Sequence, residues 1–363
     1  MRKTKKTWVD NFPDLTASLV ACVIGLLVGF LVLVVTNPEN SIKGFKALLT
    51  GAVSGGFTDF GNVIVYAGIY ILCGLSVGFA GKTGVFNIGL SGQFIIGGVA
   101  ALYVGIMWTW LPPGIHCLVA VIAGLLAGLG WSSTIGFLRA FFNISEIVVG
   151  ILLNYIGVYL ANMIILDKFY DSYANRSQAV QSSALIPTLG MEKIFPGTGA
   201  DITFFVAILL AIVIHVILNK TTFGYEIRTC GFNKDAGIYS GINAKKNVIL
   251  SMAIAGALPG LAGAMFYLSS SHNYIQIVDS APAIPMRGIV VSLVAMGSPI
   301  GIILSAIFIA YITVSGLDMQ LYGYVPEIVD VVTSVIIYCT AFVILIKKAI
   351  STILRKSHDL NEG

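Results

Sequence analysis

The residues best suited to chemistry lie in an otherwise apolar stretch, where residues 81–94 read GKTGVFNIGLSGQF. Asn87, Ser91 and Gln93 would be costly to expose to lipid, and four glycines weaken a continuous helix around them. We therefore expect a helix to break near residues 87–93, with these side chains facing a polar cavity. Broken helices at membrane depth are typical of solute transport sites. A polar seam that only joins helices is the alternative.

The same stretch contains GLSG at residues 89–92, which fits the pattern around the nucleophile of intramembrane serine proteases. A catalytic serine needs a histidine within hydrogen-bond reach. The histidines are poor partners, because His116, His272 and His358 lie at or outside the ends of apolar runs. His215 lies near one such end and is interpreted as an interfacial or packing residue. We expect no catalytic residue, and the unpaired spacing of the five cysteines predicts neither a metal site nor a disulfide framework.

Composition decides the class of protein. Hydrophobic residues make up 57% of the 363 residues, charged residues make up 10%, and the mean hydropathy is +0.91. A water-soluble fold could not easily present such a chain to solvent. Unbroken apolar runs indicate helices rather than the alternating strands of a membrane barrel, and forty glycines suit closely packed helices. The sequence thus predicts an all-α, polytopic membrane protein.

Ten apolar runs predict about ten transmembrane segments. They are residues 15–35, 61–80, 84–107, 115–138, 144–166, 202–218, 248–268, 288–297, 300–314 and 328–346. Nearly all are long enough to cross about 30 Å of hydrocarbon. The short run 288–297 is counted because the positive-inside rule places Lys82, Arg139, residues 219–246 and the basic C-terminal tail on one side. We therefore expect two crossings that turn at residues 297–299, and both termini in the cytoplasm.

This topology predicts three regions. Residues 1–60 would form a cytoplasmic tail, the first transmembrane helix and an external loop. Residues 61–346 would form the membrane core, and residues 347–363 a cytoplasmic tail. The long loop at residues 167–201 would be external, either as a landing surface for a partner or as a plain solvated loop.

Residues 219–246 form the longest polar interruption between two membrane-length runs, with five basic residues against two acidic ones. Asn233 is placed as an N-cap, and residues 234–240 can form about two helical turns before Gly241 stops them. A short fixed helix suits the transmission of movement from a partner. An ordinary basic loop that only sets topology is the alternative.

This loop resembles the cytoplasmic coupling loop of ATP-binding-cassette importer permeases of the sugar and nucleoside branch. The resemblance is carried by residues 228–233 (RTCGFN), Ala236, Tyr239, residues 241–243 (GIN) and Lys246. Further matches in the expected order are residues 87–93 (NIGLSGQ), 145–148 (SEIV), 153–156 (LNYI), 256–264 (GALPGLAGA) and 325–330 (VPEIVD). They cover roughly residues 61–346. Arg287 and Ser298 depart from the family pattern, which leaves a solute-binding role of this hairpin open.

The resemblance implies a permease subunit of an ATP-driven importer, not an enzyme, since the sequence contains no P-loop. It implies an ATPase subunit, a second permease that we expect to be a different chain, and an external substrate-binding lipoprotein as partners. The lipid bilayer surrounds it, and neither a nucleic acid nor a cofactor is expected. The candidate contacts with the ATPase are Arg228, Asn233, Ala236, Tyr239, Gly241 and Asn243.

The expected solute is a neutral polar molecule, because the candidate groups along its path are uncharged donors and acceptors. These candidates are Asn87, Ser91, Gln93 and Asn154, with Phe86 and Tyr155 as rings that could stack on a base or sugar. The basic N-terminal extension resembles that of the larger permease of nucleoside importers. Nucleosides are therefore expected at the cytoplasmic membrane, with simple sugars as the nearest alternative.

An ion-coupled secondary transporter is the competing class of function. Such a carrier should place a carboxylate near the membrane midplane. Glu146 lies close to the inner end of its run and is expected to pair with Arg139, while Glu327 and Asp330 open the last helix, where the helix dipole favours carboxylates. None of the three predicts a midplane site.

Overall fold

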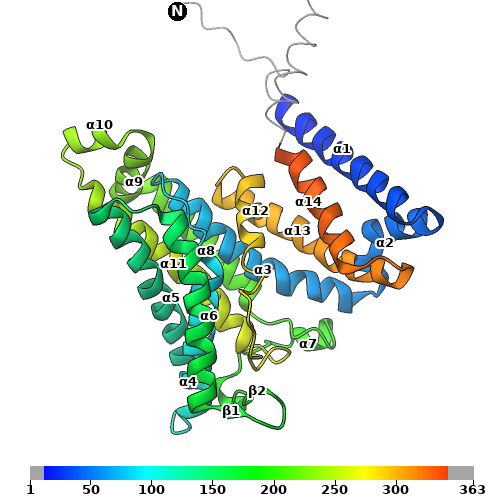
Figure 1. The fold of residues 1–363 in the computed structure, drawn as a ribbon, viewed down its shortest axis with the longest axis horizontal. Coiled ribbons are helices and arrows are strands. Elements are labelled where there is room, and N and C mark those ends of the chain that lie inside the picture. The colour runs from blue at the N-terminus through cyan, green and yellow to red at the C-terminus, as the bar shows by residue number, and fades with distance from the viewer. Residues whose placement is uncertain (1–11, 342–363) are drawn as a thin grey trace, which may run out of the picture. The chain divides into compact units, whose positions relative to one another are not determined.

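The computed structural model describes residues 12–341, and its regular elements are helices apart from one short hairpin. The helices are α1 (Phe12–Thr36), α2 (Ser41–Ser54), α3 (Phe57–Gly81), α4 (Leu90–Met107), α5 (Ile115–Phe142), α6 (Glu146–Lys168), α7 (Met191–Ile194), α8 (Thr203–Lys220), α9 (Thr222–Phe232), α10 (Lys234–Tyr239), α11 (Ala244–Tyr267), α12 (Arg287–Val294), α13 (Pro299–Met319) and α14 (Pro326–Ala341) (Figure 1). Strands β1 (Tyr170–Asp171) and β2 (Arg176–Ser177) pair antiparallel. The all-α prediction is confirmed.

Each of the ten predicted apolar runs contains a helix. Within the described residues, seven helices are long and apolar enough to cross a membrane, namely α3, α4, α5, α6, α8, α11 and α13. The chain is a polytopic membrane protein. Helix α12 has only eight residues and rises about 12 Å, less than half of the hydrocarbon thickness. If the predicted crossing at α12 exists, non-helical residues must complete it, and that crossing stays a prediction.

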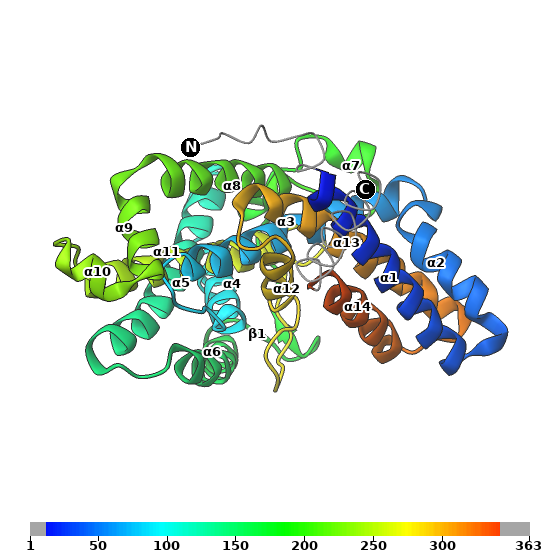
Figure 2. The same cartoon turned by 90° about the horizontal axis from the view of Figure 1, so that it is seen from above.

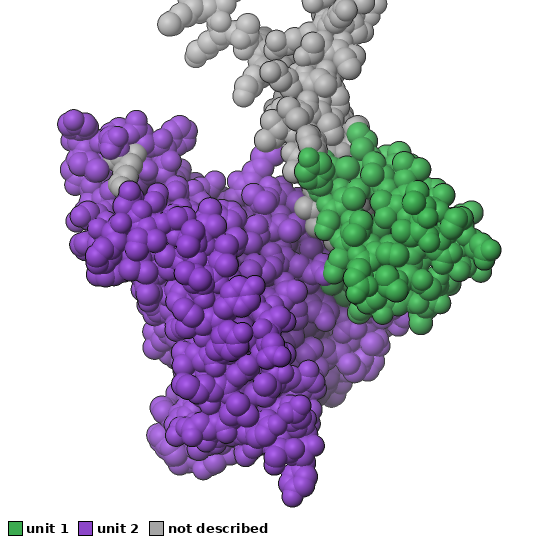
Figure 3. Space-filling model, viewed as in Figure 1, with its two compact units in different colours: residues 1–54, 312–363 green, residues 55–311 purple. Residues whose placement is uncertain are grey.

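The chain divides into two compact units (Figure 3). Unit 1 comprises residues 1–54 and 312–363, and unit 2 comprises residues 55–311. In unit 1, α1 packs against α14, and the Tyr324 hydroxyl donates to the carbonyls of Leu33 (3.2 Å) and Asn37 (3.1 Å). The boundaries of these units differ from the boundaries of the three predicted regions. The predicted regions therefore stay a prediction. The predicted tail at residues 347–363 and the N-terminal tail up to residue 11 lie outside the described residues.

Unit 2 has three mostly buried helices, α3, α4 and α11, with α5, α6 and α8 exposed around them (Figure 2). Glycines let α5 and α11 touch through their backbones. A Cβ atom on Gly260 of α11 would lie 2.6 Å from the Gly124 carbonyl oxygen and 2.7 Å from the Gly128 Cα atom of α5. Both distances are shorter than van der Waals contact, so only glycine allows this approach. Small residues give transmembrane helices the close packing that replaces hydrophobic driving force in lipid.

The two ends of unit 2 differ. One end carries Lys82, α9 and α10 and is named the α10 end, while the opposite end carries β1 and β2 and is named the hairpin end (Figure 1). Helix α3 runs to the α10 end, and α4 returns from it toward the hairpin end. There the Gly105 carbonyl of α4 accepts a hydrogen bond from Gln181 N (3.2 Å).

Candidate functional site

The predicted break lies between α3, which ends at Gly81, and α4, which begins at Leu90. A reciprocal amide pair closes it: Asn87 Nδ2 donates to Gln93 Oε1, and Gln93 Nε2 donates to Asn87 Oδ1, both at 2.9 Å. Asn87 Nδ2 also donates to Ser76 Oγ (2.8 Å), and Asn87 Oδ1 accepts from Gly89 N (3.1 Å). Since unpaired polar groups are costly in an apolar interior, these bonds stabilise the non-helical backbone.

Asn154 of α6 holds the start of α4. Its Oδ1 atom accepts from Gly92 N (2.7 Å), and its Nδ2 atom donates to the Ile88 carbonyl (3.0 Å). The first N–H groups of a helix have no partner within the helix, so this side chain supplies one. Asn87 and Gln93 are 0% exposed and Asn154 is 3% exposed. These contacts join neighbouring helices, as in the polar seam that the sequence analysis gave as the alternative. That these groups also line a solute path stays a prediction.

The two candidate stacking rings lie apart from each other. Tyr155 is 51% exposed on the outer face of α6, whereas its neighbour Asn154 points into the interior. Phe86 is half-buried, and its backbone N–H donates to Glu146 Oε1 (3.4 Å). The structure therefore does not bring Tyr155 together with the buried amides.

The predicted pairing of Glu146 with Arg139 is confirmed, with 3.2 Å between Arg139 Nε and Glu146 Oε2. The same carboxylate accepts a hydrogen bond from Phe86 N, in the non-helical residues 82–89 between α3 and α4, which we name the first broken crossing. The pair thus fixes both the corner between α5 and α6 and the non-helical residues beside it. This is a structural role, not that of a midplane carboxylate.

Ser91 connects this region to a second broken crossing that the sequence analysis missed. Its Oγ atom donates to the Pro282 carbonyl at 2.7 Å, so the hydroxyl is bonded to the backbone and not to a histidine. Pro282 belongs to residues 268–286, a non-helical segment that runs from the hairpin end into the interior. At the hairpin end Gln276 pairs with Arg176 of β2, and α12 then continues toward the α10 end. The prolines at 282 and 285, which cannot donate a backbone hydrogen bond, were the available signal.

The predicted short helix at the α10 end is confirmed. Asn233 caps α10, because its Oδ1 atom accepts from Ala236 N at 3.0 Å. Gly241 follows the helix with φ +81°, a backbone conformation that favours glycine. Asn243 caps the next helix, since its Oδ1 atom accepts from Lys246 N at 3.0 Å. These three residues therefore shape the loop.

Large exposed side chains surround α10. Phe232 is 97% exposed, Tyr239 is 93% exposed, Tyr225 is 62% exposed and Ile238 is 52% exposed. We name these four residues the coupling patch. Exposed aromatic side chains are typical of surfaces for protein–protein contact, and a role of these residues in coupling stays a prediction.

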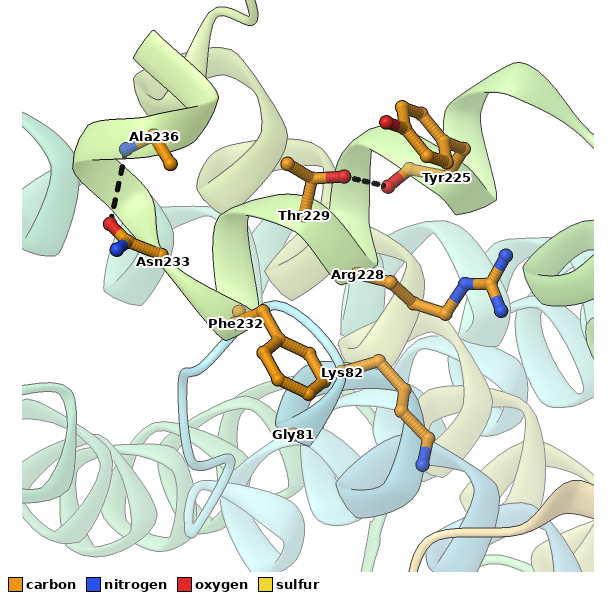
Figure 4. A pocket seen from close by; sticks show the side chains of 9 residues that line it. Gly81, Lys82, Tyr225, Arg228, Thr229, Phe232, Asn233 and Ala236 are labelled. Atoms are coloured by element: carbon orange, nitrogen blue, oxygen red, sulfur yellow. Dashed lines mark hydrogen bonds between the residues drawn. The ribbon is translucent and has the colours of Figure 1, made fainter. Parts of the chain in front are cut away.

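A cavity of about 680 Å³ lies beside the coupling patch. Phe232 stands at its rim, and the side chains of Lys82 and Arg228 extend along the same side of it (Figure 4). Arg228 donates to the Gly224 carbonyl and to Asn219 Oδ1, both at 3.4 Å. Two cationic side chains and an exposed ring suit this cavity for contact with acidic and apolar groups of a partner.

The end of α9 touches the start of the first broken crossing. A Cβ atom on Gly231 would lie 2.9 Å from the Lys82 carbonyl carbon and 3.0 Å from Gly84 N. Asn247 Nδ2 donates to Glu226 Oε2 (3.1 Å), which ties α9 to α11 as well. Movement of α9 and α10 would therefore reach residues 82–89 through direct backbone contact.

Comparison with known proteins identifies the family of this chain. A family described as "Branched-chain amino acid transport system / permease component" matches residues 60–341. The chain belongs to this family. The permease is 34% identical over 334 residues to "Guanosine ABC transporter permease protein NupP" of Bacillus subtilis (strain 168), covering 92% of the permease and 94% of NupP.

Two further relatives have the same extent. The permease is 32% identical to "Nucleoside ABC transporter permease protein NupB" of Lactococcus lactis subsp. cremoris (strain MG1363), covering 91% of each chain. It is 24% identical to "Glucose ABC transporter permease protein TsgB13" of Haloferax volcanii, covering 93% of the permease and 88% of TsgB13. No solved structure matches the permease at a significant level.

Proposed function

We propose that this chain is the membrane-spanning subunit of an ATP-driven importer that takes up nucleosides. The observation that supports nucleosides as the solute is the pair of full-length relatives, 34% and 32% identical, that are named for guanosine and for nucleosides. The relative named for glucose is only 24% identical over a similar length. Simple sugars are therefore the second candidate.

The coupling patch is the proposed docking surface for a separate ATPase subunit. The sequence contains no nucleotide-binding P-loop, so the permease must receive the energy of hydrolysis from a partner. The positive-inside rule places the α10 end, with Lys82 and Arg228, in the cytoplasm. Ten crossings of the cell membrane then put both termini in the cytoplasm and the hairpin end outside, where residues 167–201 face a substrate-binding lipoprotein. A second permease subunit completes the pore.

Orientation is tested by single cysteines at Ser182, near the hairpin end, and at Ser240, next to α10, in a cysteine-free variant. Both side chains are exposed. An impermeant thiol reagent added to intact cells should label the cysteine at 182 and leave the cysteine at 240 unlabelled. Labelling of both from the same side would end the proposed topology.

The function is tested by transport in membrane vesicles that contain the permease, its ATPase, a second permease and the lipoprotein. We expect ATP-dependent accumulation of radiolabelled guanosine, adenosine or uridine, with unlabelled nucleosides competing better than ribose, galactose or glucose. Vesicles with an ATPase subunit that binds but does not hydrolyse ATP are the control. If monosaccharides compete and nucleosides do not, the solute assignment fails and the importer assignment stands.

A further inference from the structure

A second cavity, of about 420 Å³, lies along the second broken crossing in unit 2. Its main lining residues are Tyr267, His272, Tyr274, Gln276, Ser280 and Pro282. The volume falls within the range of roughly 300–1,000 Å³ that is typical of small-molecule sites, near its lower limit. The cavity therefore has the size of a site for a small solute, between the hairpin end and the interior contact of Ser91 with Pro282.

The wall of this cavity is held in place by neighbouring elements. Asn162 of α6 donates from Nδ2 to the Val278 carbonyl (2.7 Å). Ser177 of β2 exchanges two hydrogen bonds with Ile275, from Ser177 N to the Ile275 carbonyl (2.9 Å) and from Ile275 N to Ser177 Oγ (3.0 Å). Together with the bond from Ser91 to Pro282, these contacts fix a segment that is not part of any helix. A site fixed in this way is largely formed before its ligand arrives.

Aromatic rings give the cavity flat faces. The Tyr267 ring packs edge-on against Phe94 (5.7 Å between centroids) and Phe266 (5.1 Å), which fixes its orientation. The Arg176 guanidinium lies 3.8 Å from the centroid of the Tyr274 ring and occupies one face of that ring. Flat, fixed aromatic faces stack on heterocyclic bases with little regard for which base is present.

The polar groups of the cavity are uncharged and available. Among the described residues, the side chains of Gln276 and Ser280 are exposed and have no hydrogen-bond partner. They contrast with Asn87 and Gln93, whose amides bond to each other. The described lining contains no Asp, Glu, Lys or Arg. These features favour a neutral ligand with donors and acceptors at its edge.

We propose that this cavity binds the nucleoside on its way into the membrane, with the base against the tyrosine rings and polar edges on Gln276 and Ser280. The inference rests on the function proposed above and adds the place of the solute. It moves the main solute contacts from the first broken crossing to the second. The buried amides of the first crossing would then hold the neighbouring helices in place without contacting the solute.

A protection experiment tests this directly. Gln276→Cys is placed in a cysteine-free variant and assembled with the second permease and the ATPase, in vesicles without the lipoprotein, so that docking of the lipoprotein cannot cause protection. We expect millimolar guanosine to slow the labelling of the cysteine at 276 by a small thiol reagent about tenfold, while ribose has no effect. Tyr173→Cys is the matched control, because Tyr173 is fully exposed at the same end and outside the cavity.

A second pair of variants tests the rings in the complete importer. Tyr274→Ala should lower the maximal rate of guanosine uptake about tenfold or more, and Tyr274→Phe should retain it, since the ring remains. Unchanged labelling at 276 in the presence of guanosine, or wild-type uptake by Tyr274→Ala, would overturn the site while vesicles with the wild-type chain still import guanosine. Equal protection by ribose would overturn the nucleoside class. Failure of the wild-type importer to take up any nucleoside would instead overturn the function on which the site rests.

Discussion

The two broken crossings of unit 2 use polar residues in opposite ways. In the first, residues 82–89, the side chains that stand out in the sequence are buried and bonded to one another or to backbone. In the second, residues 268–286, the backbone is bonded to neighbours and the side chains of Gln276 and Ser280 remain available. We therefore name the first crossing, whose polar groups bond to one another, the joint, and the second, whose side chains remain available, the surface.

This difference follows from where each crossing lies. Residues 82–89 touch Gly231 of α9, and under the proposed coupling they would transmit movement without exposing unpaired backbone groups, because the amides supply the missing hydrogen bonds. Residues 268–286 begin at the hairpin end, where a solute would arrive. There the contacts come from other elements, and side chains are free to meet a ligand.

The largest effect is expected from Asn87→Leu, which would break the joint. The change leaves the Gln93 amide, the Ser76 hydroxyl and Gly89 N without their partner. Each such loss costs about 1–3 kcal/mol, so the sum approaches the total stability of a typical domain. We expect little folded permease in size-exclusion chromatography of detergent extracts.

The matched variant for this prediction is Asn162→Leu in α6, which removes a single hydrogen bond to the Val278 carbonyl of the second crossing. It should lower thermal stability only modestly. Equal loss of folded protein in the two variants would remove the distinction between joint and surface.

The next effect concerns the coupling patch, the proposed docking surface for the ATPase subunit. Tyr239→Ala removes a ring that is 93% exposed, so the stability of the free permease should change by less than about 0.5 kcal/mol. A central aromatic residue of an interface contributes about 2 kcal/mol or more, which corresponds to roughly a 30-fold loss in affinity for the ATPase subunit. Binding of purified ATPase to immobilised permease measures it, with Tyr173→Ala as the control. Unchanged affinity would argue that the ATPase docks elsewhere.

Gly231→Ala should separate docking from transmission. A Cβ atom at this position would clash with the Lys82 carbonyl and shift α9 away from residues 82–84. We expect normal ATPase binding, and ATPase stimulation by lipoprotein and nucleoside reduced about tenfold. Gly237→Ala in α10 is the control, because its Cβ atom would make only ordinary contacts, 3.8 Å from Cys230 Sγ and Thr229 Cγ2. Wild-type stimulation in the Gly231 variant would contradict a rigid contact between α9 and the first crossing.

The sequence predicted more of the helices than of their contacts. Apolar runs must form helices in lipid, because no water is present to bond their backbone groups, and this fixed the place of all ten. Asn233 and Gly241 act within a few residues of themselves, so the ends of α10 were predictable as well. The partners of Asn87 and the course of residues 268–286 depend on segments far apart in the chain. No local pattern distinguishes an amide that bonds another amide from one that faces a cavity.

The smallest effect is expected from pH, and it comes from the loop that precedes α8. Asp201 ends this loop, and burial raises the pKa of its carboxyl, whose Oδ1 atom accepts a hydrogen bond from Thr203 N (2.9 Å). The folded chain therefore binds a proton more readily than the unfolded chain, so this group adds stability as pH falls through its raised pKa toward the ordinary value of an aspartate.

Thermal unfolding of purified permease between pH 7.5 and 5.5 measures this contribution. Asp201→Asn removes the titrating carboxyl, so the unfolding temperature of the variant should change less favourably than that of the wild type as pH is lowered over this range. An equal change in the two proteins would show that protonation of Asp201 does not contribute to folding.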